Sequence, residues 1–438
     1  MLLRGPDDLA WTDGRADRIV AGVITGYVAA VLRRSSFPLL VLAAACSAAP
    51  PAAPRTTAAL RPLPGPGTDV NAIFDGTFEG KTIVLLGESL HVTVEFPRVR
   101  LPILRYLKTL GFDVLAVEGS ALDAWVAADD LLRAPNDPEV LQKASAEGWL
   151  AIWNTASMRE VLAWVRNNMY FASMDIQPAM GKHKDVLAAF LARLSGYADE
   201  NADDLLASLE PLRTCSGPQP PPKQRAYAVQ RIYELVQKAT PKVRAVSAMH
   251  ADALSLVPEM LEERMHHCAN LDQNAYWKTY KESRDRYQAT NVLALRDRVS
   301  RTHRVVVWAH HSHVGYRGAG AGASVSVSGV LREKAPGQTY ALGLYAGAGD
   351  FLRSEDGPKD RLTITSLPPA GDPGFTGIDA LRALDAAPNG YFLDVQRAPI
   401  GREPLGYTLE GKSVTLRLAG DFDGIVFVPR VSAAQLDE

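Results

Sequence analysis

The stretch that most constrains the fold is residues 83–118, in which two apolar runs flank a segment with helical periodicity. The first run breaks at Gly87 and is followed by Glu88 and His91, and the second run ends at Glu118. Between the runs, apolar residues recur three and four positions apart, which is typical of an amphipathic helix. Strand, helix and strand in this order predict a βαβ unit whose strands are parallel and buried on both faces.

The polar residues of this unit lie where parallel sheets bind their ligands. We expect the two strands to be neighbours, so that Glu88, His91 and Glu118 meet at the carboxyl ends of the strands, which is the ligand-binding edge of open α/β sheets. Two later strand-like runs also end in polar residues, which are Asp175 and Gln177 in one and His310, His311 and His313 in the other.

The chain as a whole predicts an α/β protein with a mainly parallel central sheet flanked by helices. One domain is expected over residues 69–438, with a helical lobe at about residues 182–290, because the middle of the chain shows helical periodicity. The formal net charge of −2 gives no electrostatic case for a nucleic-acid partner. No apolar run after residue 50 is long enough to cross a bilayer.

The first 46 residues have the layout of an export signal. Arg33 and Arg34 precede an apolar run at residues 38–45, and Cys46 follows it, in a segment that resembles a bacterial lipobox. We therefore expect a lipid on Cys46 and a cell-envelope protein, periplasmic or surface-facing, that touches the membrane only through this anchor. The long segment before the arginines favours a true start near Val31, and an internal apolar helix is the alternative interpretation.

Residues 47–68 are rich in proline and alanine, which predicts an extended tether. Beyond it, Cys215 and Cys268 form either one disulfide or two buried thiols, and the sequence leaves both open.

Local patterns add three smaller predictions. In the helical stretch that follows the second strand, Asp129 and Asp130 are expected on an exposed face. Ser157 is expected to cap the next helix, because Glu160 three residues later completes a capping box. His250 is expected to be solvated, since its spacing from other histidines matches no metal template.

If the strand ends meet in one sheet, the residues of the cleft are Glu88, His91, Glu118, His310 and His313. A carboxylate beside an imidazole fixes the tautomer of the ring and makes it more basic. Such a histidine can deprotonate water for attack on a carbonyl carbon, while a second imidazole or Arg100 stabilises the oxyanion.

Other uses of the same residues stay open. The five cleft residues could instead bind a divalent metal, which would make the protein a metal-dependent hydrolase. A binding lipoprotein without catalysis is a further alternative. Glu118 could also be held in a buried ion pair with Arg100 or Arg284. A serine nucleophile is disfavoured, because the chain has no G-x-S-x-G motif and nothing in the first loop activates Ser89.

A series of motifs resembles the erythromycin esterase family. In this sequence they occupy residues 87–91, 95, 100, 111–118, 153–155, 164–166, 175–177, 284–291 and 308–313. They follow the order of the family and cover roughly residues 80–320, so together they are far more specific than any one motif.

The resemblance implies an α/β core with helical additions and a hydrolase that opens a macrolide lactone by water attack, with no cofactor expected and a divalent metal left open by the motifs. It makes His91 the general base and gives it Glu88 and Glu118 as carboxylate partners. It makes His310 and His313 substrate or oxyanion contacts. The residues expected to bind the substrate are Arg100, Asp175, Gln177, Arg284 and Asn291.

Two positions depart from the family pattern: His311 stands where the family usually has asparagine, and Val92 stands where a glycine commonly follows the motif histidine. The acid–base residues are intact, so the expected substrate is an ester or lactone rather than macrolides alone.

Overall fold

The computed structural model describes residues 60–65, 68–147, 154–175, 186–209, 221–269, 276–317, 325–354, 362–367, 379, 381–382, 387–397, 405–409, 412–416 and 418–436. All of them belong to one compact unit, Ala58–Glu438. The expected export signal with Cys46, as well as Gln177 and Cys215, lies outside the described residues, and so does the side chain of Cys268.

The unit is built on an eight-stranded sheet with the strand order β1-β9-β12-β6-β2-β5-β3-β4. Its strands are β1 (Leu60–Pro62), β2 (Ile83–Glu88), β3 (Val114–Ser120), β4 (Tyr170–Asp175), β5 (Val305–His310), β6 (Thr339–Ala346), β9 (Tyr391–Asp394) and β12 (Gly424–Val428). Two separate antiparallel pairs are β7 (Asp350–Ser354) with β8 (Leu362–Ser366) and β10 (Leu405–Leu409) with β11 (Lys412–Leu416).

The six strands from β12 to β4 run parallel, and β9 and β1 add an antiparallel edge. The predicted mainly parallel sheet is therefore confirmed. The expectation that β2 and β3 are neighbours is wrong, because β5 lies between them and pairs with both. Residues 60–62, expected to belong to an unpacked tether, form β1 because their backbone pairs with β9.

Most of the helices lie between strands in the sequence. Among the described residues between β4 and β5, all regular secondary structure is helical. The α-helices that cover the sheet or extend it are α2 (Asn71–Phe74), α3 (Glu95–Thr109), α4 (Ala121–Arg133), α5 (Pro138–Glu147), α6 (Ala156–Asn168), α7 (Val186–Ala198), α8 (Ala202–Leu209), α9 (Pro222–Val246), α10 (Ala248–Leu254), α11 (Val257–Ala269), α12 (Tyr276–Ala294), α13 (His311–Val314), α14 (Val327–Lys334) and α16 (Leu418–Asp421). A π-helical turn, Leu295–Val299, continues α12. Among the described helices, none combines the length and apolarity that a membrane crossing needs.

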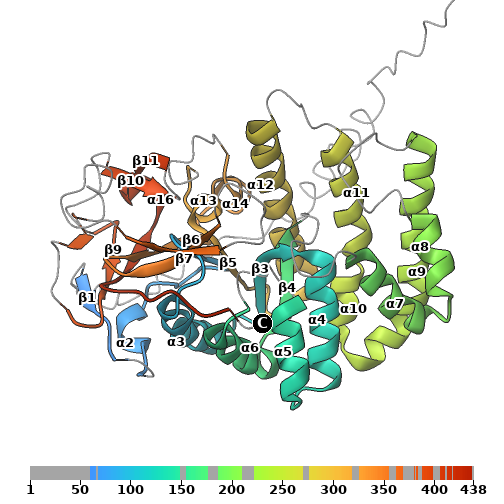
Figure 1. Ribbon diagram of the computed structural model, residues 1–438, viewed down its shortest axis with the longest axis horizontal. Helices are drawn as coiled ribbons and strands as arrows, with labels where there is room; N and C mark the ends of the chain where they lie inside the picture. Colours follow the sequence, from blue (N-terminus) through green and yellow to red (C-terminus); the bar gives the residue numbers. More distant parts are fainter. Residues whose placement is uncertain are drawn as a thin grey trace, which may run out of the picture. The chain divides into compact units, whose positions relative to one another are not determined.

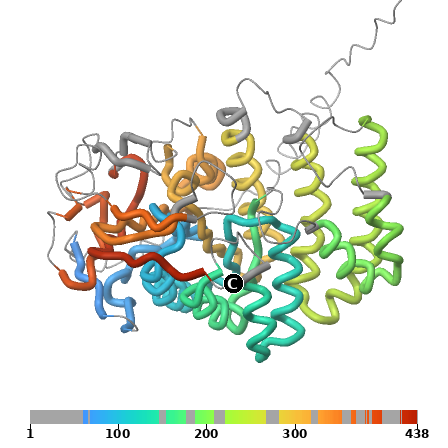
Figure 2. Tube along the Cα trace, viewed as in Figure 1, coloured from blue at the N-terminus to red at the C-terminus, as the bar shows by residue number. Residues whose placement is uncertain are grey.

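The sheet has a hydrophobic core on each face, because successive side chains of a strand point to opposite sides. In β2, Val84 and Leu86 pack in one core with α3 and α6, whereas Ile83 and Leu85 pack in the other with α12 and α14. Figure 1 shows these helices on opposite sides of the central strands. Each such fully buried side chain contributes about 1.5–3 kcal/mol. In Figure 2, β5 lies beside β2 although more than two hundred residues separate them in the chain.

The predicted exposure of Asp129 and His250 is wrong, because both side chains are fully buried. Asp129 accepts hydrogen bonds from the hydroxyl of Tyr197 (2.5 Å) and from Arg193 (2.6 Å), and His250 Nε2 lies 3.3 Å from it. His250 Nδ1 meets the hydroxyl of Tyr170 at 2.9 Å. The helices inserted between β4 and β5 pack on α4 and cover the face that the sequence suggested was solvated.

The cap of α6 is Thr155 and not Ser157. The Thr155 hydroxyl accepts a hydrogen bond from the backbone N–H of Met158 (3.3 Å), whereas Ser157 lies inside the first turn and is buried. Thr155 takes the role because its own backbone is extended, which is the conformation of a capping residue.

Candidate active site

Four adjacent parallel strands end in polar side chains at one edge of the sheet. Glu88 ends β2 and His310 ends β5, and the two residues are direct partners in the register of these strands. Glu118 lies near the end of β3 and Asp175 ends β4. His91 follows β2 in the loop that leads to α3. These residues, which are distant in the sequence, therefore lie at the same edge of the sheet, as expected.

A glycine lets the last histidine of the group reach this edge. Helix α13 begins directly after β5 and turns back over β2, where a Cβ at Gly87 would lie 2.8 Å from Cβ of Val314. Only glycine allows this approach without a shift of the helix. The close packing of α13 places His313 near the end of β3.

Glu88 and His91 form a hydrogen-bonded pair. Nδ1 of His91 lies 2.6 Å from Oε1 of Glu88, and Trp308 Nε1 donates to Oε2 (3.2 Å). Glu88 is 3% exposed, whereas the side chain of His91 is 19% exposed. Burial acts to raise the pKa of Glu88, but Arg100 and His91 outweigh it and hold that pKa below its usual value. Glu88 therefore stays ionised and fixes the ring of His91.

Arg100 has a different place from the one expected. Its side chain has no exposed surface, donates to the second oxygen of Glu88, and lies with its guanidinium 4.0 Å from the ring centroid of Trp308. In this structure the guanidinium is buried beneath Glu88 and contacts that carboxylate. Arg100 neutralises the buried carboxylate, which burial alone would make unfavourable.

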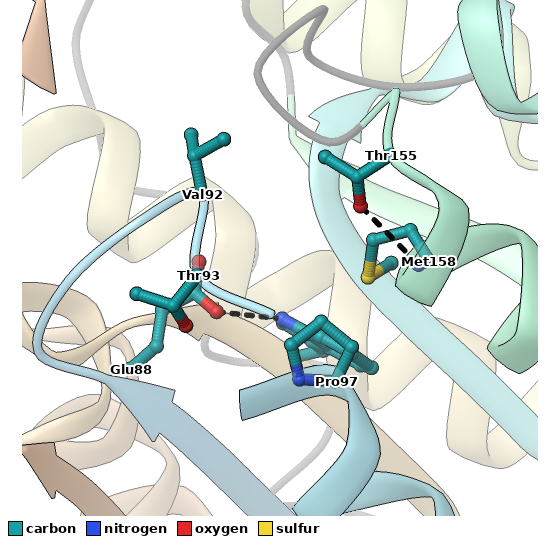
Figure 3. Close-up of a pocket in the computed structure, with 7 residues that line it drawn as sticks. Glu88, Val92, Thr93, Pro97, Thr155 and Met158 are labelled. Carbon is teal, nitrogen blue, oxygen red and sulfur yellow. Dashed lines mark hydrogen bonds between the residues drawn. The ribbon is translucent and has the colours of Figure 1, made fainter. Parts of the chain in front are cut away.

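A small pocket lies beside Glu88. Figure 3 shows it between the loop after β2 and the start of α6. The residues that line it are Glu88, Val92, Thr93, Pro97, Thr155, Met158 and Trp308. The loop that carries His91 thus forms one wall of a cavity and is not packed on all sides.

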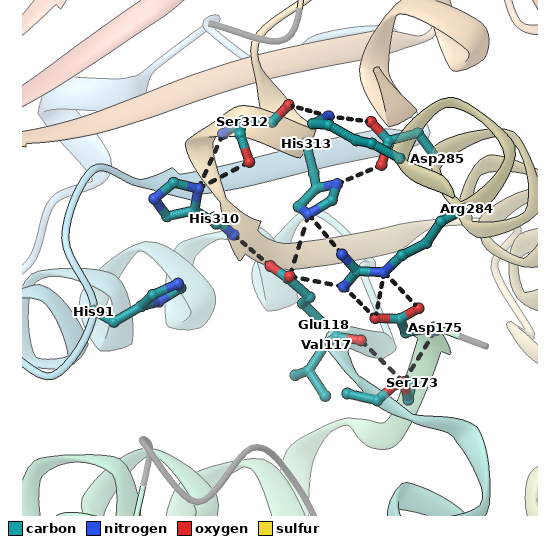
Figure 4. Close-up of polar contacts among 12 residues, drawn as sticks. His91, Val117, Glu118, Ser173, Asp175, Arg284, Asp285, His310, Ser312 and His313 are labelled. Carbon is teal, nitrogen blue, oxygen red and sulfur yellow. Dashed lines mark hydrogen bonds and ion pairs between the residues drawn. The ribbon is translucent and has the colours of Figure 1, made fainter. Parts of the chain in front are cut away.

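Glu118 connects β3 to the histidines of β5 and α13. The pairing of β3 with β4 shifts register between Val117 and Ser120, and this irregularity surrounds Glu118. One carboxylate oxygen accepts from the backbone N–H of His310 (2.8 Å), and the other lies 3.2 Å from His313 Nε2 (Figure 4). Burial acts to raise the pKa of Glu118, but His313 and Arg284 outweigh it and hold that pKa well below its usual value.

His313 lies between two carboxylates. Its Nδ1 is 2.5 Å from Oδ1 of Asp285, and its Nε2 faces Glu118. Burial acts to lower the pKa of His313, but Asp285 and Glu118 outweigh it and raise that pKa above its usual value. Asp285 was not among the predicted site residues, although it lies next to Arg284 in the motif at residues 284–291.

His310 is held as a neutral ring with a defined tautomer. It caps α13: its Nδ1 accepts from the backbone N–H of Ser312 (3.3 Å) and lies 2.9 Å from the hydroxyl of Ser312. Burial, followed by the neighbouring His311 and His91, holds the pKa of His310 well below its usual value. The ring proton is therefore on Nε2, which is buried and has no partner among the described residues.

The rings of His310 and His91 are close, with centroids 4.7 Å apart. A buried, unpartnered N–H donor thus lies next to the histidine that Glu88 orients. Buried donors are normally satisfied, and an exception of this kind is typical of a site that receives a ligand.

Arg284 and Asn291 project from α12 toward the end of β4. Arg284 donates to both oxygens of Asp175, the shortest contact being 2.5 Å, and to Glu118 at 3.0 Å. Asn291 donates to the backbone carbonyl of Met174 (3.0 Å), so its amide fixes α12 to β4. Of the expected substrate-binding residues, Arg284 and Asp175 therefore border the site, whereas the Asn291 amide serves the backbone.

His311 gives the protein a defined acid sensitivity. It is fully buried and stacked on His310, and burial followed by the charge of His91 lowers the pKa of His311 to about 3. Between about pH 6.5 and 3 the unfolded chain binds a proton that the folded ring does not. The folded state therefore becomes less stable as the pH is lowered through this window. From pH 7 to pH 5 this one ring costs about 2 kcal/mol.

We expect His311→Asn to remove the part of the acid-induced loss of stability that comes from His311. The part that comes from His310 should remain. Urea unfolding of both proteins at pH 7 and pH 5 measures this loss, and the variant should lose about 2 kcal/mol less than the original protein on acidification. Equal losses in both proteins would contradict the neutral state of His311.

A metal does not fit the donors that the structure describes. Among the described residues no group of three or more His, Cys, Asp or Glu side chains is arranged to hold an ion. The carboxylates of Glu88 and Glu118 instead each face a buried guanidinium, from Arg100 and Arg284 respectively.

Known proteins resemble this chain in sequence and in fold. The sequence model of the erythromycin esterase family matches residues 107–431, a span that includes Glu118, Arg284, His310 and His313. The protein YbfO of Bacillus subtilis (strain 168), which its name describes only provisionally as a hydrolase, is 25% identical over 329 residues. The alignment covers 67% of this chain and 71% of YbfO.

Three solved structures share the fold. A Bacillus cereus protein has a TM-score of 0.63 at 18% identity and covers 86% of this chain and 97% of its own, and a protein named for succinoglycan biosynthesis has a TM-score of 0.61 at 15% identity, with 86% and 96% covered. A mutant of erythromycin esterase EreC, in its open conformation, has a TM-score of 0.58 at 17% identity, with 84% and 96% covered. With the family match over most of its length, the chain belongs to the erythromycin esterase family.

Proposed function

We propose that this protein cleaves a carboxylic ester or lactone by attack of water, with His91 as the general base. Membership in the erythromycin esterase family supports a hydrolase. The assignment of His91 as the base rests on its contact with Glu88, in which Nδ1 of His91 lies 2.6 Å from Oε1 of Glu88. The ring centroids of His310 and His91 are 4.7 Å apart.

The first step is proton transfer from water. With Nδ1–H of neutral His91 donating to Glu88, the lone pair of the ring is on Nε2, where it takes a proton from a water molecule. The oxygen of that water attacks the carbonyl carbon of the ester. Glu88 stabilises the imidazolium that forms, because it is ionised and in contact with the ring.

The second step is collapse of the tetrahedral intermediate. The oxyanion is stabilised by the Nε2–H of His310, a donor that is already held in place by the N-terminal turn of α13. His91 then returns its proton to the leaving alkoxide, which gives an alcohol and a carboxylic acid. A donor of this kind typically contributes about a hundredfold to a thousandfold in kcat.

The cluster around Glu118 supports these two histidines. Glu118 accepts from the backbone N–H of His310 and so fixes the end of β5. Arg284 and His313 neutralise Glu118 and hold it in place. These residues act through His310, and we assign them a positioning role.

The proposal is tested with erythromycin and p-nitrophenyl acetate as probes. The purified protein is expected to hydrolyse at least one of them, with a mass gain of one water in the sum of the products, and to keep its rate after dialysis against a chelator. Loss of activity on chelation that zinc restores would favour the metal-dependent alternative, and no turnover of macrolides or simple esters would contradict the assignment.

A further inference from the structure

The loop that carries His91 is tied to a distant part of the chain, residues 431–436, which we call the strap. The strap follows β12 and runs antiparallel to residues 92–94, with Ala433 opposite Thr93. Val94 N–H donates to the carbonyl of Ser432 (3.0 Å), and Ala434 N–H donates to the carbonyl of Val92 (3.1 Å). The residue next to His91 is therefore held by a backbone hydrogen bond from the strap.

Val92 has a backbone conformation that its side chain disfavours. Its φ is +52°, in the left-handed region, which is rare for any residue with a Cβ and rarer for a β-branched one. Its side chain is buried and lines the pocket beside Glu88. Such a conformation persists only when the surroundings impose it.

The strap is itself anchored at both ends. Val431 N–H donates to the carbonyl of Ala348 (2.8 Å), its carbonyl accepts from Asp350, and the chain passes so close to Gly349 that a Cβ there would meet the Val431 oxygen at 1.8 Å. At the other end, Leu436 pairs with Thr155, the cap of α6. The strap can therefore impose a conformation on the loop, because neither of its ends is loose.

One side chain adds to the backbone pairing. The carboxylate of Glu95, in the first turn of α3, accepts a hydrogen bond from the backbone N–H of Ser432 (2.7 Å). The strap thus holds both the residue after His91 and the start of the helix that follows the loop.

We propose that the strap positions the general base: its hydrogen bonds to Val92, Val94 and Glu95 keep Val92 left-handed and so keep His91 against Glu88. This inference rests on the proposed function, since it assigns positioning residues to that reaction. Without the strap, Val92 relaxes to a negative φ, and the His91 ring turns away from its carboxylate.

The first test is Ala434→Pro, which removes the N–H that binds Val92. Ala433→Pro is the matched control, because the N–H of Ala433 donates no hydrogen bond among the described residues. With p-nitrophenyl acetate, we expect Ala434→Pro to lower kcat by about tenfold to a hundredfold with little change in KM, since small misplacements of a base have effects of this size.

The decisive readout is rescue by Val92→Gly in the Ala434→Pro protein. Glycine adopts a positive φ without strain, so the loop should keep its shape without the strap, and kcat should recover most of its loss. A purely structural role of the strap predicts no recovery. An unchanged kcat in Ala434→Pro, or no rescue by glycine, would overturn the proposal.

A second pair of variants covers the case in which proline prevents folding. Glu95→Ala removes the acceptor of the Ser432 N–H, whereas Glu95→Gln keeps an amide oxygen in its place. We expect kcat to fall several-fold in Glu95→Ala and to stay near the original in Glu95→Gln, with rescue of the first by Val92→Gly. If Glu95→Ala and Glu95→Gln have equal rates while His91→Ala is inactive, the positioning role of the strap is refuted and the proposed function stands. An active His91→Ala would refute the proposed function instead.

Discussion

Replacement of His91 by alanine is expected to reduce kcat/KM for ester hydrolysis by about a thousandfold, within the range of positioned general bases. The residue has no substitute in the site, because His310 is held neutral with its proton on Nε2 and His313 is engaged by two carboxylates. The side chain is partly exposed and belongs to neither core, so the fold should survive. Steady-state kinetics with p-nitrophenyl acetate, alongside circular dichroism, measures both effects.

The control for this variant is His266→Ala. His266 is an exposed residue of α11, with 67% of its side chain accessible, and it is expected to have no effect on kcat or KM. If His91→Ala keeps more than about a tenth of the original rate, the water-activation mechanism loses its base, since general-base catalysis contributes about a hundredfold or more.

The largest loss of stability is expected for Arg284→Met. Arg284 is buried and contacts two buried carboxylates, Asp175 at 2.5 Å and Glu118 at 3.0 Å. Methionine fills much of the same volume but leaves both acids without their guanidinium. Removal of one partner from a buried ion pair costs about 3–5 kcal/mol, and we expect urea unfolding at pH 7 to show a loss of this size.

Arg298→Met provides the comparison, because Arg298 pairs with Glu259 on the surface and both side chains are more than 40% exposed. Surface pairs contribute about 1 kcal/mol or less. A loss in Arg284→Met no larger than in Arg298→Met would show that the carboxylates of Asp175 and Glu118 are not held by this arginine.

The sequence was most informative where local pattern and topology agree. Glu88, Glu118 and His310 could be placed together because each ends an apolar run, and the carboxyl ends of parallel strands share one edge. The order of the strands could not be obtained in this way. Nothing local shows that β5 inserts between β2 and β3, since the segment arrives from about two hundred residues later in the chain.

Burial of charged groups was the main feature that the sequence did not reveal. Arg100 was expected to line the cleft and Asp129 to be exposed, yet each is fully buried against an oppositely charged side chain of another element. Such burial depends on which helices pack together, and amphipathic periodicity does not specify that. Val92 is a similar case, because the strap that imposes its conformation is more than three hundred residues away.

Water activation by His91 is tested most directly by a single-turnover reaction with p-nitrophenyl acetate in heavy-oxygen water, stopped at early times and analysed by mass spectrometry of product and intact protein. Water activated by His91 predicts one heavy oxygen in the acetate of the first turnover and no acetylated protein at any time. An acetyl group on the protein that forms before acetate is released, on His91, Ser89 or Glu88, would contradict it.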